Sequence, residues 1–360
     1  KDGSIGGAAI ATYLLEKTRC IKHEEGERNF HCFYALCIAN QFARAAAAAA
    51  AANPAEVFKV PGAEGDSVPK GAVQWDALLL EQSADYKKAL EPQNFDELYC
   101  NDPVQRKRKE DKDDPQWFAY LYCGLNNLDL ESDDKNTVIN ELLSVLSGLL
   151  QLTLIEFKQP TLGGSFKKGG NLKSQPAFTK AAQLLGLKAH EKDLLDILVQ
   201  KATIIEGQLA DMEVGEQELA CQSIVKLIYD ALFSYVVKRI NESLSVNDDE
   251  AAGGRRSFIG ILDIFGFEHF KRNSFEQLCI NFANEKLQQL FLDDTIKSEK
   301  KLYDDEQLHV QVNYEDNQSC IQLIADEKRG LFKALNDVSQ MKITDDKSNK
   351  RTDETFYTRL

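Results

Sequence analysis

SFIGILDIFGFEHFKRNSFEQLCINFANEKLQQLF, from Ser257 to Phe291, is the stretch of sequence that decides the fold. Phe258 to Leu262 are apolar or Gly, which predicts a strand covered on both faces, as in a parallel sheet. The run ends on Asp263, and open α/β sheets bind ligands at the carboxyl ends of such strands. Ser274 and Gln277 have the spacing of a capping box, which begins a helix. The expected order is therefore strand, turn and helix, with a carboxylate at the ligand-binding edge.

This stretch resembles the myosin motor. There, DIFGFE at 263–268 corresponds to switch II, and NSFEQLCINFANEKLQQLF at 273–291 corresponds to the start of the relay helix. The resemblance implies a mixed α/β fold that is mostly α. It implies a fragment of a P-loop NTPase motor of the myosin type, with a few strands of the central sheet. It also implies ATP and Mg²⁺ as cofactors.

The resemblance extends along the chain and divides it into three parts. Residues 1–256 resemble the upper 50-kDa region with the start of the transducer strands, on the evidence of GERNFH at 26–31 and LIYDALFSYVVKRINESL at 227–244. Residues 257–268 correspond to a central-sheet strand and switch II. Residues 269–360 correspond to the relay helix and the lower 50-kDa actin-binding region. Against this pattern the chain starts after switch I and stops before the converter.

Composition narrows the class of protein. The length of 360 residues suggests about two domains. The net charge of −14 argues against nucleic-acid binding. No run approaches the roughly 20 apolar residues that cross a bilayer, so we expect no membrane span. Eight Cys without a CxxC pair, and five scattered His, indicate reduced thiols rather than a metal site. The resemblance places the protein in the cytoplasm, on the actin cytoskeleton.

Periodicity predicts the remaining elements. A strand is expected at 5–15. A buried helical face follows, carried by Phe30, Phe33, Leu36 and Cys37. A long amphipathic helix is expected over Glu218–Leu244, with the apolar stripe Ile224, Leu227, Ile228, Ala231, Leu232, Tyr235, Val236 and Ile240. Helical segments are also expected at 138–157, 181–187, 191–199, 317–324 and 331–338, with a hairpin-like loop at 163–173.

The relay-like helix is expected to run from Ser274 to about residue 300. Its predicted apolar face consists of Phe275, Leu278, Phe282, Leu287, Leu290 and Phe291. Asn281, Asn284 and Glu285 are the polar residues of interest on this helix. Two segments receive no function: the eight alanines at 45–52, and the charge run QRKRKEDKDD at 105–114, which is typical of a solvated surface.

Phosphoryl transfer depends mainly on positioning and charge stabilisation. Asp263 stands where a Walker B-type aspartate holds Mg²⁺, through water. Gly266 offers a backbone N–H with no side chain in the way, which suits a γ-phosphate oxygen. By resemblance, Glu268 pairs with a switch I arginine and orients the attacking water. The alternative is structural: Asp263 and Glu268 would then only end a strand and cap a turn.

Four residues are expected to contact filamentous actin by resemblance. Glu206 lies 16 positions before Gln222, where myosins tend to carry an acidic or phosphorylatable residue in an actin-binding loop. A permanent charge there would replace phosphorylation. Lys328, Met341 and Lys342 belong to the helix-loop-helix of the lower domain, which matches through DNQ at 316–318. The end of that region, SQMKI at 339–343, departs from the family pattern.

Three functions stay open at this point. The first is an actin-activated ATPase motor that works with the remainder of the head and with light chains or calmodulin on an absent neck. The second is a kinesin-like NTPase, against which DIFGFE argues. The third is a non-enzymatic actin-binding or scaffold module. No GxxxxGK[ST] motif occurs in the sequence, so we expect this chain alone to be inactive. The myosin class, direction of movement and oligomeric state are not encoded here.

Overall fold

The computed structural model describes residues 6–13, 15–22, 29–37, 40, 72–74, 78, 115–128, 135–157, 172–205, 208–211, 214–245, 258–311, 313–340 and 356. The alanine run at 45–52 and the charge run at 105–114 lie outside the described residues. Contacts divide the chain into two compact units, Lys1–Gly254 and Arg255–Leu360.

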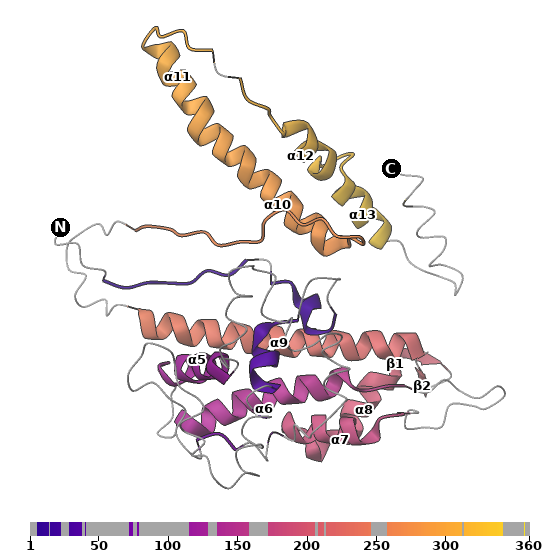
Figure 1. Ribbon diagram of the computed structural model, residues 1–360. Helices are drawn as coiled ribbons and strands as arrows, with labels where there is room; N and C mark the ends of the chain where they lie inside the picture. The colour runs from indigo at the N-terminus through magenta and orange to yellow at the C-terminus, as the bar shows by residue number, and fades with distance from the viewer. Residues whose placement is uncertain are drawn as a thin grey trace. The chain divides into compact units, whose positions relative to one another are not determined.

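The first unit is mostly helical. The helices that the structure describes in it include η1 (Lys17–Cys20), α5 (Pro115–Asn126), α6 (Lys135–Thr153), α7 (Gln175–Leu184), η5 (Lys188–His190), α8 (Glu191–Val199) and α9 (Val214–Leu244). α6 lies between α9 and α7 (Figure 1). The predicted helices at 181–187 and 191–199 are thus confirmed in kind, and the second has the bounds of α8.

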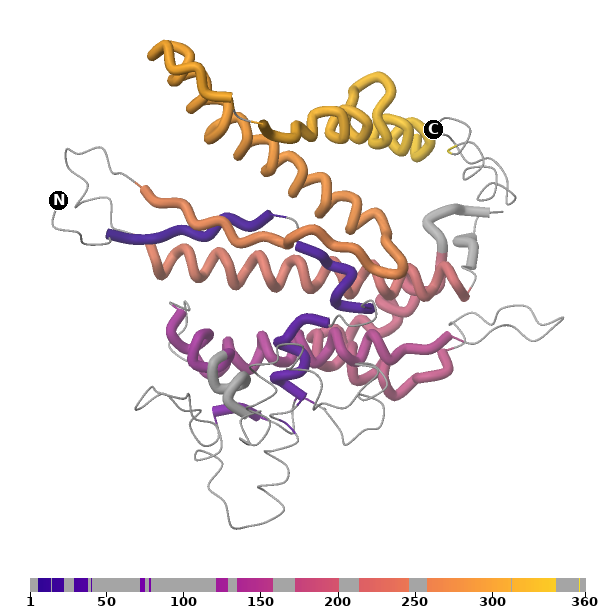
Figure 2. The backbone as a smooth tube through the Cα atoms, turned by 45° about the horizontal axis from the view of Figure 1, so that its top comes forward, coloured from indigo at the N-terminus to yellow at the C-terminus, as the bar shows by residue number. Residues whose placement is uncertain are grey.

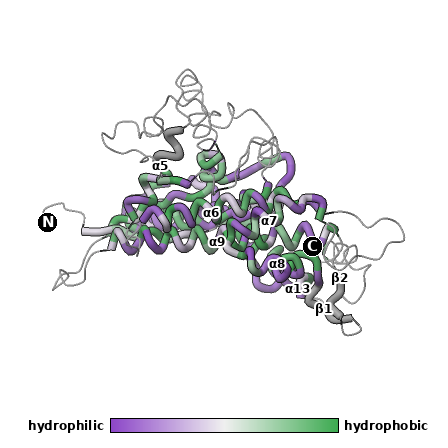
Figure 3. The backbone as a smooth tube through the Cα atoms, turned by 90° about the horizontal axis from the view of Figure 1, so that it is seen from below, coloured by the Kyte–Doolittle hydropathy of each residue, from purple (hydrophilic) through white to green (hydrophobic). Residues whose placement is uncertain are grey.

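The core of the first unit is aliphatic and aromatic, with α6 at its centre. Ile139, Leu143 and Leu149 are fully buried, as is Phe178 on the facing α7. Figure 3 shows the mixture of hydrophobic and hydrophilic residues along α6 and α9 that accompanies this one-sided burial. The two helices α6 and α7 approach closely at Gly148, where a Cβ would lie 2.9 Å from the Leu185 side chain.

The long helix α9 confirms the predicted amphipathic element. Tyr229 is buried and stacks on Phe30, with ring centroids 4.6 Å apart. Its hydroxyl lies 3.6 Å from the Cys32 sulfur. Three members of the predicted stripe are wrong: Leu227 is 68% exposed, Tyr235 is 40% exposed, and Ala231 is exposed as well. The exposed members lie on one row of the helix at four-residue steps, beside the row that packs against the core, which consists of Ile224, Ile228, Leu232, Val236 and Ile240.

Helix α9 is also long and apolar enough, by length and composition, to cross a membrane; this holds for one helix among the described residues. The prediction of no such segment therefore overlooked it. Cys221, Val225 and Tyr229 of this helix are buried in the interior of the first unit, whereas only 17% of its most apolar 18-residue window is buried. An ion pair of 2.7 Å between Asp230 and Lys17 also ties it to η1.

The described strands form one antiparallel hairpin, β1 (Gln200–Ile205) and β2 (Gln208–Asp211). This hairpin was not predicted, although the β-branched run Thr203–Ile205 before a Gly-containing pair of residues is a hairpin signal. An isolated antiparallel bridge joins Phe157 to Leu172. These residues flank the predicted hairpin-like loop, most of which lies outside the described residues.

Residues 6–13 are extended but do not join a strand, so the predicted strand at 5–15 is not found. Helix α9 supplies hydrogen-bond partners for two residues of this segment, Ala8 and Ile10. The Asn241 side chain of α9 accepts a bond from the Ile10 N–H (2.6 Å) and donates one to its carbonyl (2.9 Å). The amide thus substitutes for one peptide group of a neighbouring strand. The Ala8 N–H donates to the Leu244 carbonyl in the same way.

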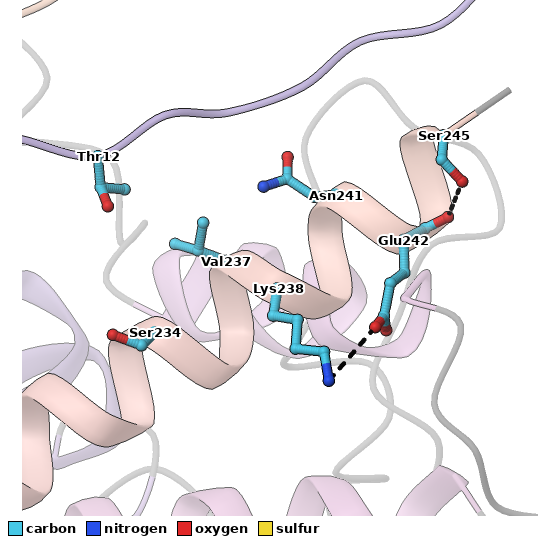
Figure 4. A pocket seen from close by; sticks show the side chains of 7 residues that line it. All are labelled: Thr12, Ser234, Val237, Lys238, Asn241, Glu242 and Ser245. Carbon is cyan, nitrogen blue, oxygen red and sulfur yellow. Dashed lines mark hydrogen bonds and ion pairs between the residues drawn. The ribbon is translucent and has the colours of Figure 1, made fainter.

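A shallow groove of ≈ 480 Å³ lies between this extended segment and the end of α9 (Figure 4). It is lined by Thr12, Ser234, Val237, Lys238, Asn241, Glu242 and Ser245. The charges in it compensate each other, because Lys238 Nζ lies 3.7 Å from Glu242 Oε1 and Glu242 also pairs with Arg239.

The second unit is built on one continuous helical run. α10 (Phe275–Phe291) passes into the π-helical segment η7 (Leu292–Lys297) and then into α11 (Ser298–Asp305). Figure 2 shows the run as one rod, after which the chain returns as α12 (Gln318–Ala325) and α13 (Leu331–Ser339). The predicted capping box is confirmed: the Ser274 N–H donates to Gln277 Oε1 at 2.9 Å.

Packing in the second unit differs from the prediction. Phe275, Leu290 and Phe291 of the expected apolar face are more than half exposed. The buried positions of the run are instead Gln277, Ile280, Gln289 and Leu292. Phe332 of α13 fits edge-on against Phe282, with centroids 5.1 Å apart, and joins the helical hairpin to α10.

The predicted buried strand at Phe258–Leu262 is extended but exposed. Phe258, Ile259 and Ile261 are 92%, 93% and 93% accessible, and no described residue pairs with them in a sheet. A strand is buried only when neighbours cover both faces and both edges. The described residues provide no such neighbours, so the prediction of burial is wrong for this structure.

Candidate functional site

The turn at 263–268 follows this extended segment and leads to α10. The Asp263 carboxylate is exposed and has no hydrogen-bond or ion-pair partner among the described residues. A Cβ at Gly266 would have no heavy atom within 4 Å, and its φ lies outside the left-handed region. Neither packing nor backbone strain in this unit therefore explains glycine at this position.

Glu268, in contrast, is firmly held by α10. Asn281 Oδ1 accepts from the Glu268 N–H and Asn281 Nδ2 donates to the Glu268 carbonyl, both at 2.8 Å. Gln277 Nε2 donates to the Glu268 carboxylate, Oε2, at 3.3 Å. The backbone and the side chain of Glu268 are thus both fastened to the first turns of one helix.

Local sequence explains why this fastening is rigid. Gln277 is 4% exposed and performs two roles, since its Oε1 caps the helix while its Nε2 reaches Glu268. Asn281 lies one turn further along the same face. The two amides therefore fix the end of the turn relative to the helix axis.

The residues of the turn fit one arm of a magnesium–phosphate site. Mg²⁺ is commonly bound by one or two carboxylates, water and substrate phosphates, and Asp263 supplies an accessible carboxylate. Gly266 leaves its backbone open to the approach of an anion. No group of three His, Cys, Asp or Glu that would hold a metal is found among the described residues.

Of the predicted actin-facing residues, the structure describes one. Lys328 lies in the turn between α12 and α13, where the predicted break is confirmed. Asp326 Oδ1 accepts from the backbone N–H groups of Arg329 (2.8 Å) and Lys328 (2.9 Å), and these bonds lower the pKa of its carboxyl. Glu206, Met341 and Lys342 lie outside the described residues.

The thiols give no sign of reactive chemistry. Burial raises the pKa of Cys20, Cys37 and Cys221 to about 12 and that of Cys32 to about 11. All seven described cysteines are free. Because the thiolate is the reactive form, the buried thiols serve as small apolar groups.

Sequence reasoning missed how the helical run meets α12. Asn317 Nδ2 donates to the Glu285 carbonyl at 2.8 Å and also reaches the Glu285 carboxylate. Lys297 Nζ lies 2.7 Å from Asp293 and 2.9 Å from Asp316. The contacts of Asn317 with Glu285 and of Lys297 with Asp316 join residues far apart in the sequence. The contact of Lys297 with Asp293 lies within the π-helical segment. No local pattern therefore predicts these pairs.

Comparison with known proteins assigns the family. The family model described as "Myosin head (motor domain)" matches residues 1–360. Unconventional myosin heavy chain 6 of Caenorhabditis elegans is 30% identical over 342 residues, covering 94% of this chain and 14% of its own length. Unconventional myosin IC of Drosophila melanogaster is 31% identical over 364 residues, covering 100% and 29%.

Unconventional myosin-VI of Mus musculus is 31% identical over 353 residues, which is 94% of this chain and 25% of that protein. The chain thus spans less than a third of the length of each of these relatives. The family match nevertheless runs from the first residue to the last, and it agrees with the switch-like turn and capped helix. This chain belongs to the myosin head (motor domain) family.

Proposed function

We propose that this chain forms the middle of an actin-based motor head, in which ATP hydrolysis is coupled to movement of α10. The chain acts with the remainder of the head and binds filamentous actin, with light chains or calmodulin on the neck. Asp263 holds Mg²⁺ through water. The Gly266 N–H contacts the γ-phosphate, and Glu268 orients the attacking water.

The observation that carries this proposal is the fastening of Glu268 to α10. A motor requires that a small displacement at the nucleotide be converted into movement of a rigid element. Asn281 and Gln277 supply that connection, because three hydrogen bonds join Glu268 to the helix. Asp263 and Gly266, in contrast, make no such contacts with the rest of their unit and stay available to a ligand.

The actin-facing part of the proposal rests on resemblance and on one turn. Lys328 is exposed in a turn that the Asp326 carboxylate stabilises. Glu206, Met341 and Lys342 join it as proposed contacts. Charged residues at the rim of such an interface act mainly on the rate of association and on its salt dependence.

Glu268→Ala in the intact head containing this chain tests the chemistry. We expect nucleotide binding to persist and the single-turnover phosphate burst to fall, because one preorganised electrostatic contact is typically worth about 100- to 1000-fold in rate. Quench-flow measurement of the burst with Mg²⁺-ATP provides the readout.

Glu299→Ala is the matched control, since Glu299 is an exposed glutamate of α11, far along the helical run from the turn. A burst of normal size and rate in Glu268→Ala would refute the assignment of Glu268. Absence of a burst in the unmodified head would instead favour a non-enzymatic actin-binding module.

A further inference from the structure

Six polar side chains follow one another at four-residue steps along the helical run of the second unit. We name them the polar stripe: Gln277, Asn281, Glu285, Gln289, Asp293 and Lys297. Each makes a hydrogen bond or ion pair outside the regular helical pattern. Two of them, Gln277 and Gln289, are buried at 4% and 8% exposure.

The π-helical segment keeps the far end of the stripe in line. On an α-helix each four-residue step advances by about 40° around the axis, so a long stripe would wind away from its partners. A π-helix has more residues per turn and shifts the same step in the opposite sense. Asp293 and Lys297 lie within η7, and Lys297 meets Asp316 immediately before α12.

The residues of α10 that bind the turn at 263–268 and the start of α12 are successive members of the polar stripe. Asn281 binds the backbone of Glu268, and the next member of the stripe, Glu285, binds Asn317. Four residues of α-helix span about 6 Å. The turn at 263–268 and the start of α12 are therefore fastened to successive turns of one helix.

Asn317 is committed to this contact rather than to its own helix. It occupies the N-cap of α12, where an Asn side chain ordinarily accepts from the first turn, yet it makes no such bond. Its Nδ2 reaches Glu285 instead, and Asp316 accepts the Gln318 N–H at 2.7 Å in its place.

The polar stripe also contains buried groups that destabilise the fold, so a contribution to stability does not explain why they are there. The buried oxygens Gln289 Oε1 and Asn317 Oδ1 have no hydrogen-bond partner among the described residues. A buried acceptor without a partner is destabilising, whereas apolar residues of similar shape would avoid the cost. Groups of this kind need an explanation beyond packing.

We propose that the polar stripe couples the turn at 263–268 directly to α12, with Asn317 as the positioning residue at the receiving end. A displacement of Glu268 then reaches α12 through one turn of α10, and reaches Lys328 through α12. This inference rests on the proposed function, because it assigns a purpose to the coupling between a nucleotide-sensing turn and a helix that faces actin.

The test is a double-mutant cycle on the full 360-residue chain, read out by amide hydrogen exchange of residues 318–325. Asn281→Ala removes the contact with Glu268, 37 positions before the start of the segment that is measured. We expect exchange in α12 to rise by about 3- to 10-fold, the value of one net hydrogen bond. Asn317→Ala should raise it similarly, and the double variant should show no further increase.

Asn284→Ala is the matched control. It removes the same side chain from the same helix, but Asn284 Nδ2 bonds only to the Ile280 carbonyl of α10. Exchange in α12 should stay within twofold of the parent. If Asn281→Ala melts α10, Asn281→Asp replaces it, since aspartate keeps the acceptor for the Glu268 N–H and lacks the donor.

Additive effects of Asn281→Ala and Asn317→Ala would overturn the inference, as would a change in α12 equal to that of the control. The measurement needs no nucleotide. A head that hydrolyses ATP normally while the cycle is additive would therefore refute the coupling and leave the proposed function in place. A non-additive cycle, together with the absence of a phosphate burst in the head, would support the coupling and refute the proposed function.

Discussion

Different interactions stabilise the interior of each of the two units. The first has a continuous aliphatic and aromatic core contributed by all of its principal helices. Among the described residues of the second, the buried apolar side chains are Ile280, Leu292, Ile321 and Val338. Its specific tertiary contacts come instead from amides and carboxylates, above all those of Asn281 and Asn317.

The difference indicates a division of labour. Burial of apolar surface is strong but non-directional, so it suits a frame that must remain folded. Hydrogen bonds are directional and modest in net energy, so they suit elements whose orientation must be defined and also changed. The unit that carries the switch-like turn is the one organised by hydrogen bonds.

The largest expected effect is a difference in stability when Leu is replaced by Ala in each of the two units. Leu143→Ala in α6 should lower the free energy of unfolding of the first unit by about 3–5 kcal/mol, since it creates a cavity at a fully buried position. Leu323→Ala in α12, at 74% exposure, should change stability by less than about 0.5 kcal/mol. Urea denaturation followed by hydrogen exchange distinguishes the units. An equal loss of unfolding free energy in the two variants would show that Leu323 belongs to an apolar core of the second unit.

An intermediate effect is expected at Gly330 in the turn before α13. A Cβ there would lie 2.5 Å and 2.6 Å from the Asp326 backbone N and O, atoms that cannot move aside as a side chain does. Gly330→Ala should therefore destabilise the second unit by about 1–3 kcal/mol, as overpacking does.

Gly260→Ala serves as the control for Gly330, because a Cβ at Gly260 meets nothing within 4 Å. Both variants can be compared by denaturant midpoint and by exchange in α12 and α13. An unchanged midpoint for Gly330→Ala would mean that the turn relaxes at little cost, and that it is less firmly defined than the Asp326 contacts indicate.

The smallest effect is expected from mild alkali, and it should fall on the first unit. Burial raises the pKa of Cys20, Cys37 and Cys221 to about 12, above the ordinary value of about 8.5. Their contribution to stability is fully present below about pH 8.5, and it is lost as the pH rises from there towards about 12. The midpoint of urea denaturation of the first unit should fall slightly between pH 7.5 and 9.5.

Alkylation by iodoacetamide at pH 8 gives an independent check on the thiols. Cys320 is partly exposed and should be modified while Cys20, Cys37 and Cys221 are protected. Cys221→Ala should reduce the alkaline shift of the first unit. Equal alkylation rates at all four positions would show that the core opens far more often than its packing suggests.

Much of the helical architecture could be predicted from the sequence. The capping box at Ser274, the long helix ending at Leu244 and the break after α12 all follow from local chemistry that acts within a few residues. The extended segments at 6–13 and 258–262 could be predicted as extended but not as exposed. Their burial depends on neighbouring strands, and no local pattern reports whether those neighbours are present.

The candidate site was only partly predictable. Asp263, Gly266 and Glu268 were named from a motif, and their roles stay proposals. The sequence indicates Asn281 as a polar residue on a helix. Its two hydrogen bonds to Glu268 depend on the geometry of the turn, which the sequence does not predict. The pairing of Glu285 with Asn317 spans 32 positions, and the π-helical segment changes which residues share a face. Neither is visible in α-helical periodicity.

The exposed run Phe258–Leu262 has a practical consequence for handling this protein. Five successive uncharged residues, extended and without a sheet partner among the described residues, form the kind of edge on which other chains nucleate sheets. Self-association through this run would compete with the native state. A charged residue at Ile259 or Ile261 would act as a gatekeeper against such self-association and should improve solubility.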